Sequence, residues 1–126
     1  MSVGLDSHTG LDRWWVYDYF YETLDLDKQR YPSTVEVRAD MAKAGFCRCE
    51  TSVAEHIVIE MPAQPAIEQG LLDQSYTSQL TILSKQEYQT GLERVMRAID
   101  AEKTRGAELM LVADLRLYAT VGWLDG

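Results

Sequence analysis

The chain has 126 residues, of which 46% are hydrophobic and 25% are charged. This length and composition are typical of one globular domain with its own core and exclude a disordered chain. Twenty acidic residues against twelve basic ones give a formal net charge of −8. The phosphates of nucleic acids and of anionic membranes would be repelled, so neither class of partner is expected.

The first twelve residues lack the basic and apolar stretches of a secretory signal. No segment of the chain approaches the ~18 consecutive apolar residues of a membrane-spanning helix. We therefore predict a flexible N-terminal lead-in over residues 1–12, followed by one domain over residues 13–126.

The two cysteines, Cys47 and Cys49, are separated by one residue. A disulfide between them would be strained. A zinc site would need further ligands, and His8 and His56 are not closely spaced with the pair. We predict two reduced thiols, no metal and no cofactor. Reduced cysteines are typical of cytoplasmic proteins, which is the location we expect.

Residues 13–21 form the first dense segment and contain two of the three tryptophans and three of the seven tyrosines. Apolar residues are nearly continuous here, so we predict either a short helix or an extended arm. The rings either pack into the core or form a cage for a flat or apolar small molecule, since large rings bury area and offer polar tips. The candidate ligand or interface residues of this segment are Trp14, Trp15, Tyr17, Tyr19 and Phe20.

A helix is predicted over residues 34–44, because Ser33 and Glu36 have the spacing of a capping box and Gly45 suits a left-handed C-cap. The buried stripe of this helix is expected to consist of Val37, Met41 and Ala44.

From residue 46 apolar and polar residues alternate, which predicts a strand over residues 46–61 with a bulge near Glu55 and His56. Adjacent residues on a strand point to opposite faces. Glu55 and His56 are therefore not expected to act together as an acid–base pair.

The next segment predicts a short helix over residues 66–72, begun by Pro65, and then a loop. The loop contains Tyr76, a further candidate contact residue, and hydroxyl side chains at Ser75, Thr77, Ser78 and Thr81.

A second, longer helix is predicted over residues 85–104. Ser84 and Glu87 form another capping box, and Gly106 ends the helix. Its apolar face is expected to consist of Tyr88, Leu92, Val95, Met96 and Ile99.

The last element is a strand over residues 107–121, in which one face is apolar without interruption and the other is half apolar. Such a strand is expected inside a sheet that is covered on both sides. Asp114 and Arg116 share its second face and form either an ion pair or a clamp for a substrate. Tyr118 completes the list of candidate site residues. We predict an α+β fold with two main helices on a small antiparallel sheet of strands 46–61 and 107–121.

Several stretches of sequence resemble class I SAM-dependent methyltransferases. The first three are similar to the region after the fifth strand of that fold, and the others to the end of one bacterial subgroup. These stretches are RWWVYDYF (13–20), YPS (31–33), AGF (44–46), SQLTILS with EY (78–84, 87–88) and ADLRLYATVGW (113–123).

The resemblance covers residues 13–124 and implies the C-terminal half of such an enzyme. That half carries the wall facing the substrate, whereas the cofactor is held by a Gly-rich loop in the other half. The chain contains no G-x-G, and a SAM site needs a backbone that the cofactor can approach closely. The resemblance therefore implies recognition rather than methyl transfer, and we expect no catalytic residues.

The resemblance also implies that strand 107–121 lies between strand 46–61 and a strand that this chain lacks. An exposed edge is then expected on strand 107–121. We predict a non-catalytic methyltransferase-like module that forms a homodimer through this strand or the adjoining apolar face. Two alternatives stay open: a protein that binds a small apolar ligand with its aromatic segment, and a subunit that completes a split methyltransferase.

Overall fold

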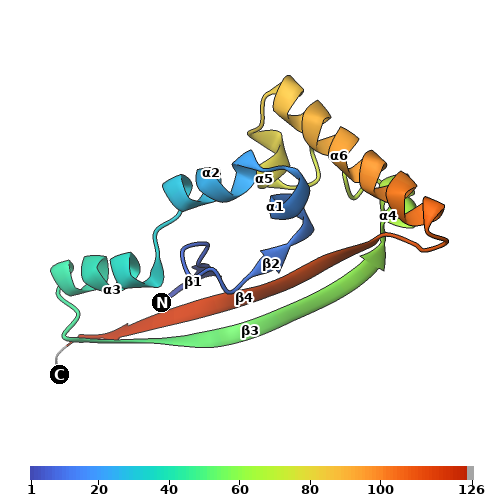
Figure 1. The fold of residues 1–126 in the computed structure, drawn as a ribbon. Helices are drawn as coiled ribbons and strands as arrows, with labels where there is room; N and C mark the ends of the chain where they lie inside the picture. Colours follow the sequence, from blue (N-terminus) through green and yellow to red (C-terminus); the bar gives the residue numbers. More distant parts are fainter. Residues whose placement is uncertain (125–126) are drawn as a thin grey trace.

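A computed structural model describes residues 1–124, which form six helices and one four-stranded antiparallel sheet (Figure 1). This confirms the predicted α+β class. The elements in chain order are β1 (Ser2–Leu5), β2 (Arg13–Trp14), α1 (Trp15–Tyr19), α2 (Glu22–Arg30), α3 (Thr34–Lys43), β3 (Arg48–Pro62), α4 (Ala63–Glu68), α5 (Ser78–Thr81), α6 (Lys85–Thr104) and β4 (Met110–Trp123).

The long strands β3 and β4 pair antiparallel over their whole length, from Arg48 opposite Trp123 to Pro62 opposite Met110. The register shifts between Val53 and Glu55, so the bulge lies beside the predicted position. The adjacency of the two predicted strands is thus confirmed. In Figure 1 they form a long curved ribbon, with all the helices on one side of it.

Strand β4 is paired along both edges, contrary to the expectation of an exposed edge. Strand β3 occupies one edge, and β1 and β2 follow one another along the other, with Leu5 opposite Leu117 and Trp14 opposite Ala113. The expectation was wrong because the N-terminal residues supply the neighbour that the resemblance implied to be missing. Among residues 1–124, the long unpaired edge belongs to β3.

The segment 1–12 is a structured part of the sheet layer rather than the expected flexible lead-in. Besides strand β1, it contains the buried carboxylate of Asp6. One oxygen of Asp6 accepts hydrogen bonds from the Thr34 backbone N–H (2.9 Å) and hydroxyl (3.0 Å), and the other accepts one from the His8 N–H (2.9 Å). The carboxylate thus occupies the N-terminus of α3, where the helix dipole favours negative charge.

Replacing Asp6 with alanine is expected to lower the free energy of unfolding by about 1–3 kcal/mol, because the bonds to Thr34 and His8 are lost in a partly buried site. Urea unfolding followed by circular dichroism measures this change. The matched control is Asp40→Ala, which removes an exposed carboxylate from α3, the helix whose N-terminus Asp6 contacts. Equal effects of the two substitutions would contradict the anchoring role of Asp6.

The hydrophobic core lies at the end of the ribbon where β3 ends and β4 begins (Figure 1). It joins side chains from α1, α4, α5, α6 and β4 with side chains from the segments between them. The capping box of Ser84 and Glu87 is present, and α6 spans the predicted residues. The fully or nearly fully buried members of the core are Trp15, Val16, Phe20, Ala63, Ala66, Leu72, Leu80, Leu83, Val95, Ile99 and Leu111.

Helix α3 covers the other end of the ribbon, and none of its residues is buried. Its predicted stripe is only partly correct, since Val37 and Met41 are half-buried and Ala44 is exposed. The stripe faces the narrow β3–β4 ribbon alone, which is too small to cover it. Gly45 has the expected positive φ, 104°.

Three further predictions need correction. Met96 is exposed because α6 lies at the margin of the core. Helix α4 begins at Ala63 instead of residue 66, so Pro65 is its third residue. The predicted loop contains helix α5, because the Thr77 hydroxyl caps it by accepting the Leu80 N–H (3.2 Å).

Candidate functional site

Most of the predicted aromatic site residues pack in or against the core. Trp15 and Phe20 are buried, and Trp14 and Tyr19 pack against the core. Phe20 also stacks on Tyr88, with ring centroids 5.8 Å apart. These rings therefore form no cage, and the core interpretation holds for them.

Among the predicted aromatic residues, Tyr17 lines a cavity formed mainly by β1, α2 and α5, and it shares a smaller one with Trp14. Its ring meets Trp14 edge to face, at 5.2 Å between centroids. Tyr76, by contrast, is exposed and lies outside that cavity.

The predicted pair of Asp114 and Arg116 exists, but both side chains are partly exposed and lie away from the cavity. Arg116 Nη1 is 3.5 Å from Asp114 Oδ1 and 3.3 Å from Asp12 Oδ1. Asp12 also accepts the Arg116 backbone N–H (3.0 Å), at the point of β4 between its pairings with β1 and β2. The pair is therefore structural, and Tyr118, half-buried on the same face of β4, does not line the cavity either.

Asp114 also bonds to His56 Nε2 across the β3–β4 pair. This hydrogen bond is the main reason that the pKa of Asp114 lies below its usual value of 3.8, and the charge of Arg116 acts in the same direction. A lowered pKa in the folded state means that the ionised carboxylate stabilises the fold above pH 3.8 and that this contribution disappears as the pH falls through the lowered pKa.

We accordingly expect the Asp114→Asn variant to lose stability less steeply than the unaltered protein on acidification below about pH 4, because the group with the lowered pKa is gone. Denaturant unfolding at a series of pH values measures both slopes. Parallel curves of the free energy of unfolding against pH for the two proteins would contradict a contribution of Asp114 to the acid dependence of stability.

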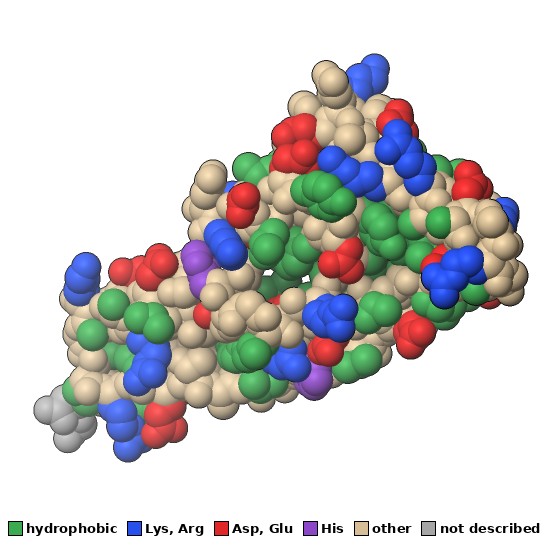
Figure 2. Space-filling view, viewed as in Figure 1, with side chains coloured by type: hydrophobic (Ala, Val, Ile, Leu, Met, Phe, Trp, Pro, Cys, Tyr) green, Lys and Arg blue, Asp and Glu red, His purple; other side chains and the backbone are tan. Residues whose placement is uncertain are grey.

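The most developed candidate site is a cavity of about 410 Å³ between the sheet and the helices above it. Strand β1 and Leu117 of β4 form its floor, whereas α1, α2, α5 and the segment after α2 form its walls. Figure 2 shows the molecule hollowed near its centre, with hydrophobic side chains around the hollow. The lining residues are Ser2, Val3, Gly4, Leu5, Ser7, Tyr17, Asp27, Tyr31, Pro32, Gln79 and Leu117.

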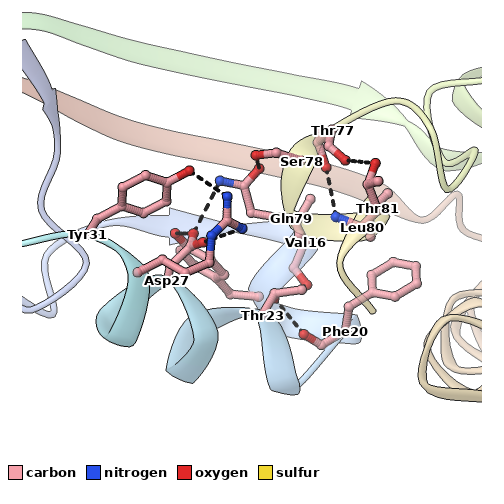
Figure 3. Close-up of polar contacts among 12 residues, drawn as sticks. Val16, Phe20, Thr23, Asp27, Tyr31, Thr77, Ser78, Gln79, Leu80 and Thr81 are labelled. Carbon is pink, nitrogen blue, oxygen red and sulfur yellow. Dashed lines mark hydrogen bonds and ion pairs between the residues drawn. The ribbon is translucent and has the colours of Figure 1, made fainter. Parts of the chain in front are cut away.

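Asp27 is the only carboxylate among these lining residues, and it is 2% exposed. Its Oδ2 accepts hydrogen bonds from the Tyr17 hydroxyl (2.7 Å) and from Gln79 Nε2 (3.3 Å). Figure 3 shows Asp27, Tyr31 and Gln79 converging from α2, from the segment after it and from α5. Three separate elements are therefore joined at one buried acid.

The second oxygen, Asp27 Oδ1, is buried without a hydrogen-bond partner among residues 1–124. The nearest cationic atom is Arg30 Nη1 at 3.9 Å, beyond hydrogen-bond distance. Arg30 instead donates from Nη2 to the Tyr31 hydroxyl at 2.7 Å. Glu22 Oε2 is also buried and unpartnered in this part of the chain, but Glu22 does not line the cavity.

Local structure holds the Asp27 group in place. The Thr23 hydroxyl, fully buried, donates to the carbonyl of Phe20 at 2.6 Å and so fixes the turn from α1 into α2. Burial and the hydrogen bond to Asp27 raise the pKa of Tyr17 far above its ordinary value of 10.0. Tyr17 therefore keeps its proton and donates a hydrogen bond to Asp27 at all physiological pH values.

Sequence reasoning had identified Tyr17 but not Asp27, Tyr31 or Gln79. Asp27 belongs to an acidic run that also contains Glu22 and Asp25. The only local signal is its spacing from Thr23, four residues earlier, which places the two on one face of α2. That face is recognised as buried only once α1 and α5 are in position.

Within residues 1–124, no three histidine, cysteine, aspartate or glutamate side chains are grouped to hold a metal ion. Cys47 and Cys49 are free thiols. None of the helices in the described part of the chain is both long and apolar enough to cross a membrane.

Comparisons with protein-family models, with curated proteins and with solved structures found no match to this chain. The resemblance to the C-terminal half of a methyltransferase therefore stays a prediction.

Proposed function

We propose that this chain is a binding module for small organic cations, with the cavity above β1 as its site and Asp27 as its anchor. The observation that carries the proposal is the buried Oδ1 of Asp27, which lacks a hydrogen-bond partner among the described residues. A buried charged oxygen without a partner costs stability, typically more than the ~1–3 kcal/mol of a neutral group. Oδ1 is covered in this structure, with Arg30 Nη1 3.9 Å away, so a ligand with a charged N–H group would recover that cost by displacing Arg30 from this position.

The cavity walls suit a cation with an apolar body. Aromatic ring faces attract cations, and the ring of Tyr17 lies in the wall of the cavity, whereas the ring of Tyr31 already carries the Arg30 guanidinium. Val3, Leu5 and Leu117 supply apolar surface on the floor. The volume of about 410 Å³ falls in the usual range for small-molecule sites, ~300–1,000 Å³. The net charge of −8 would also favour the approach of cations over anions.

Arg30 is the residue that the ligand would replace. Its guanidinium, near Asp27 Oδ1 but not hydrogen-bonded to it, is partly exposed and also lies over the Tyr31 ring at 4.9 Å. A ligand amine that donates to Oδ1 would leave Arg30 its contacts with Tyr31. The Arg30→Ala variant should therefore bind an amine more tightly than the unaltered protein, because a competing cation is removed.

The resemblance to the substrate-facing half of methyltransferases supports recognition of a small molecule without catalysis. It also favours the alternative that this chain completes a split enzyme with a separate SAM-binding chain. In either case the cavity would be the recognition site, and the same ligand tests apply.

The test compares phenethylamine with 2-phenylethanol, which has a similar shape but no charge, by isothermal titration calorimetry and thermal shift. We expect the amine to bind and to raise the melting temperature. The alcohol should bind more weakly and raise the melting temperature less. The Asp27→Asn variant should lose about 10- to 100-fold in affinity for the amine, as for a hydrogen bond to a charged group.

The control variant is Asp25→Asn, which removes the same charge from an exposed position on the same helix. An asparagine in place of Asp27 can still accept the bonds from Tyr17 and Gln79, so that variant is expected to stay folded, as circular dichroism would show. Equal binding of amine and alcohol, equal losses at positions 25 and 27, or no response to millimolar phenethylamine would each contradict the proposal.

A further inference from the structure

The outer edge of β3 pairs with no strand in the part of the chain described, residues 1–124. This edge carries an exposed apolar side chain on each face, since Val58 is 65% exposed on one and Ile59 is 49% exposed on the other. Exposed edges of this kind are templates for pairing with another strand. The edge lies on the opposite side of β4 from β1 and the cavity, so a partner bound there is independent of the proposed function.

One hydrogen bond at the end of the β3–β4 pair determines which N–H and C=O groups of β3 point toward β4 and which point to the outer edge. The Ala63 N–H donates to the Leu109 carbonyl at 2.9 Å. Hydrogen-bonded residues alternate along an antiparallel pair, so Met61, Ile59 and Ile57 bond to β4. The N–H and C=O groups of the residues between them point to the outer edge. Pro62 agrees with this assignment, because it has no N–H and falls at an outward position.

Two features bound a regular stretch of this free edge at residues 55–61. At one end the bulge between Val53 and Glu55 interrupts the regular ladder. At the other end Pro62 lacks a donor. The segment between them has outward-pointing backbone groups at His56, Val58 and Glu60, which is enough for a short ladder with one partner strand.

We propose that a second copy of this chain pairs antiparallel with the segment 55–61, with the two-fold axis at Val58. Val58 then lies opposite itself, and Ile57 lies opposite Ile59 of the second copy. His56 lies opposite Glu60, twice by symmetry. The two sheets become one continuous sheet with both β3 strands at its centre.

The chemistry of the side chains selects this register over the neighbouring ones. An axis at Ile57 would place His56 opposite Val58 and Glu55 opposite Ile59, whereas an axis at Ile59 would place Glu60 opposite Val58. An axis at His56 or at Glu60 would place that residue opposite itself. The axis at Val58 alone sets Ile57 against Ile59 and the imidazole of His56 against the carboxylate of Glu60, and cross-strand pairs of these kinds are favourable. It leaves Glu55 opposite Met61 at the two ends of the ladder.

The position of His56 in the monomer is compatible with this pairing. Its Nε2 is bonded to Asp114, and the side chain is still 45% exposed. With Nε2 donating to Asp114, the other ring nitrogen, Nδ1, can donate to Glu60 of the second copy when the imidazole carries both protons. His56 would lie between two carboxylates, one from its own β4 and one from the second copy.

The oligomeric state is tested first by light scattering on the full chain. We expect a mass near twice 14.3 kDa at micromolar concentration. The Val58→Pro variant should be monomeric, because it removes an outward N–H, whereas the bonds of β3 to β4 are made by the flanking residues. Circular dichroism would show that the variant keeps its fold.

The register is tested by oxidative cross-linking, with Cys47 and Cys49 replaced by serine. A Val58→Cys variant should form an intermolecular disulfide, because directly opposed residues lie within disulfide range. The control is Val53→Cys, which is similarly exposed on the same strand but lies far from its own copy in this register. A monomeric unaltered protein, a dimeric Val58→Pro variant that remains folded, or equal cross-linking at positions 53 and 58 would overturn the proposal.

Discussion

Replacing Gly91 with alanine is expected to lower the free energy of unfolding by about 1–3 kcal/mol, as overpacking of a core does. Gly91 lies in the middle of α6 and is buried. A Cβ added there would lie 2.2 Å from Cδ1 and 2.6 Å from Cε1 of Phe20. Phe20 is fully buried and stacks on Tyr88, so its ring has little freedom to move.

Two effects oppose each other at this position, and their relative magnitudes decide whether the substitution raises or lowers the free energy of unfolding. Alanine is the better helix former by about 1 kcal/mol. The clash with an immobile aromatic ring costs more than this gain. The position is glycine because the ring of Phe20, the C-cap residue of α1, packs directly on the backbone of α6 there.

Urea unfolding of four proteins measures the effect: the unaltered chain, Gly91→Ala, Phe20→Leu and the double variant. We expect the double variant to be more stable than the sum of the single changes predicts, because the smaller side chain relieves the clash. A Gly91→Ala variant more stable than the unaltered protein would show that the Phe20 ring does not pack directly on the backbone of α6.

Replacing Leu111 with alanine is expected to cost about 2–5 kcal/mol, the usual range for a buried leucine. Leu111 is 1% exposed and is the one strand residue in the fully buried core cluster of residues 1–124. It therefore connects the helical core to the sheet. Loss of its side chain would leave a cavity between α1, α6 and β4.

The matched control is Leu117→Ala, on the same face of the same strand but only half-buried. We expect a smaller loss there, because Leu117 borders the cavity and its removal enlarges a space that already exists. Thermal and denaturant unfolding measure both variants. Equal losses at the two positions would contradict a core located at one end of the ribbon.

The cavity and the free edge of β3 lie on opposite sides of β4 and can be tested independently. Asp27→Asn should change ligand binding and leave the mass in solution unaltered. Val58→Pro should change the mass and leave the affinity of the cavity for phenethylamine unaltered. A variant that changes both properties would show that the dimer and the cavity are coupled.

The sequence by itself determined the elements whose signals are local. The capping box of Ser84 and Glu87 located α6, because the cap and the apolar period are satisfied within one helix. A hydrophobic period of two located β3 and β4, and the bulge in β3 was expected close to its position. These elements need few distant contacts to be specified.

Only the tertiary structure decided which edge is free and where the candidate site lies. Strand β1 is short and has no alternating pattern of its own, and it forms because β4 offers it a partner and Asp6 anchors the chain that follows. Asp27 is distinguished from Asp25 only by the packing of α1 and α5 around it. Pairing and burial depend on residues distant in the chain, which is why local sequence patterns do not reveal them.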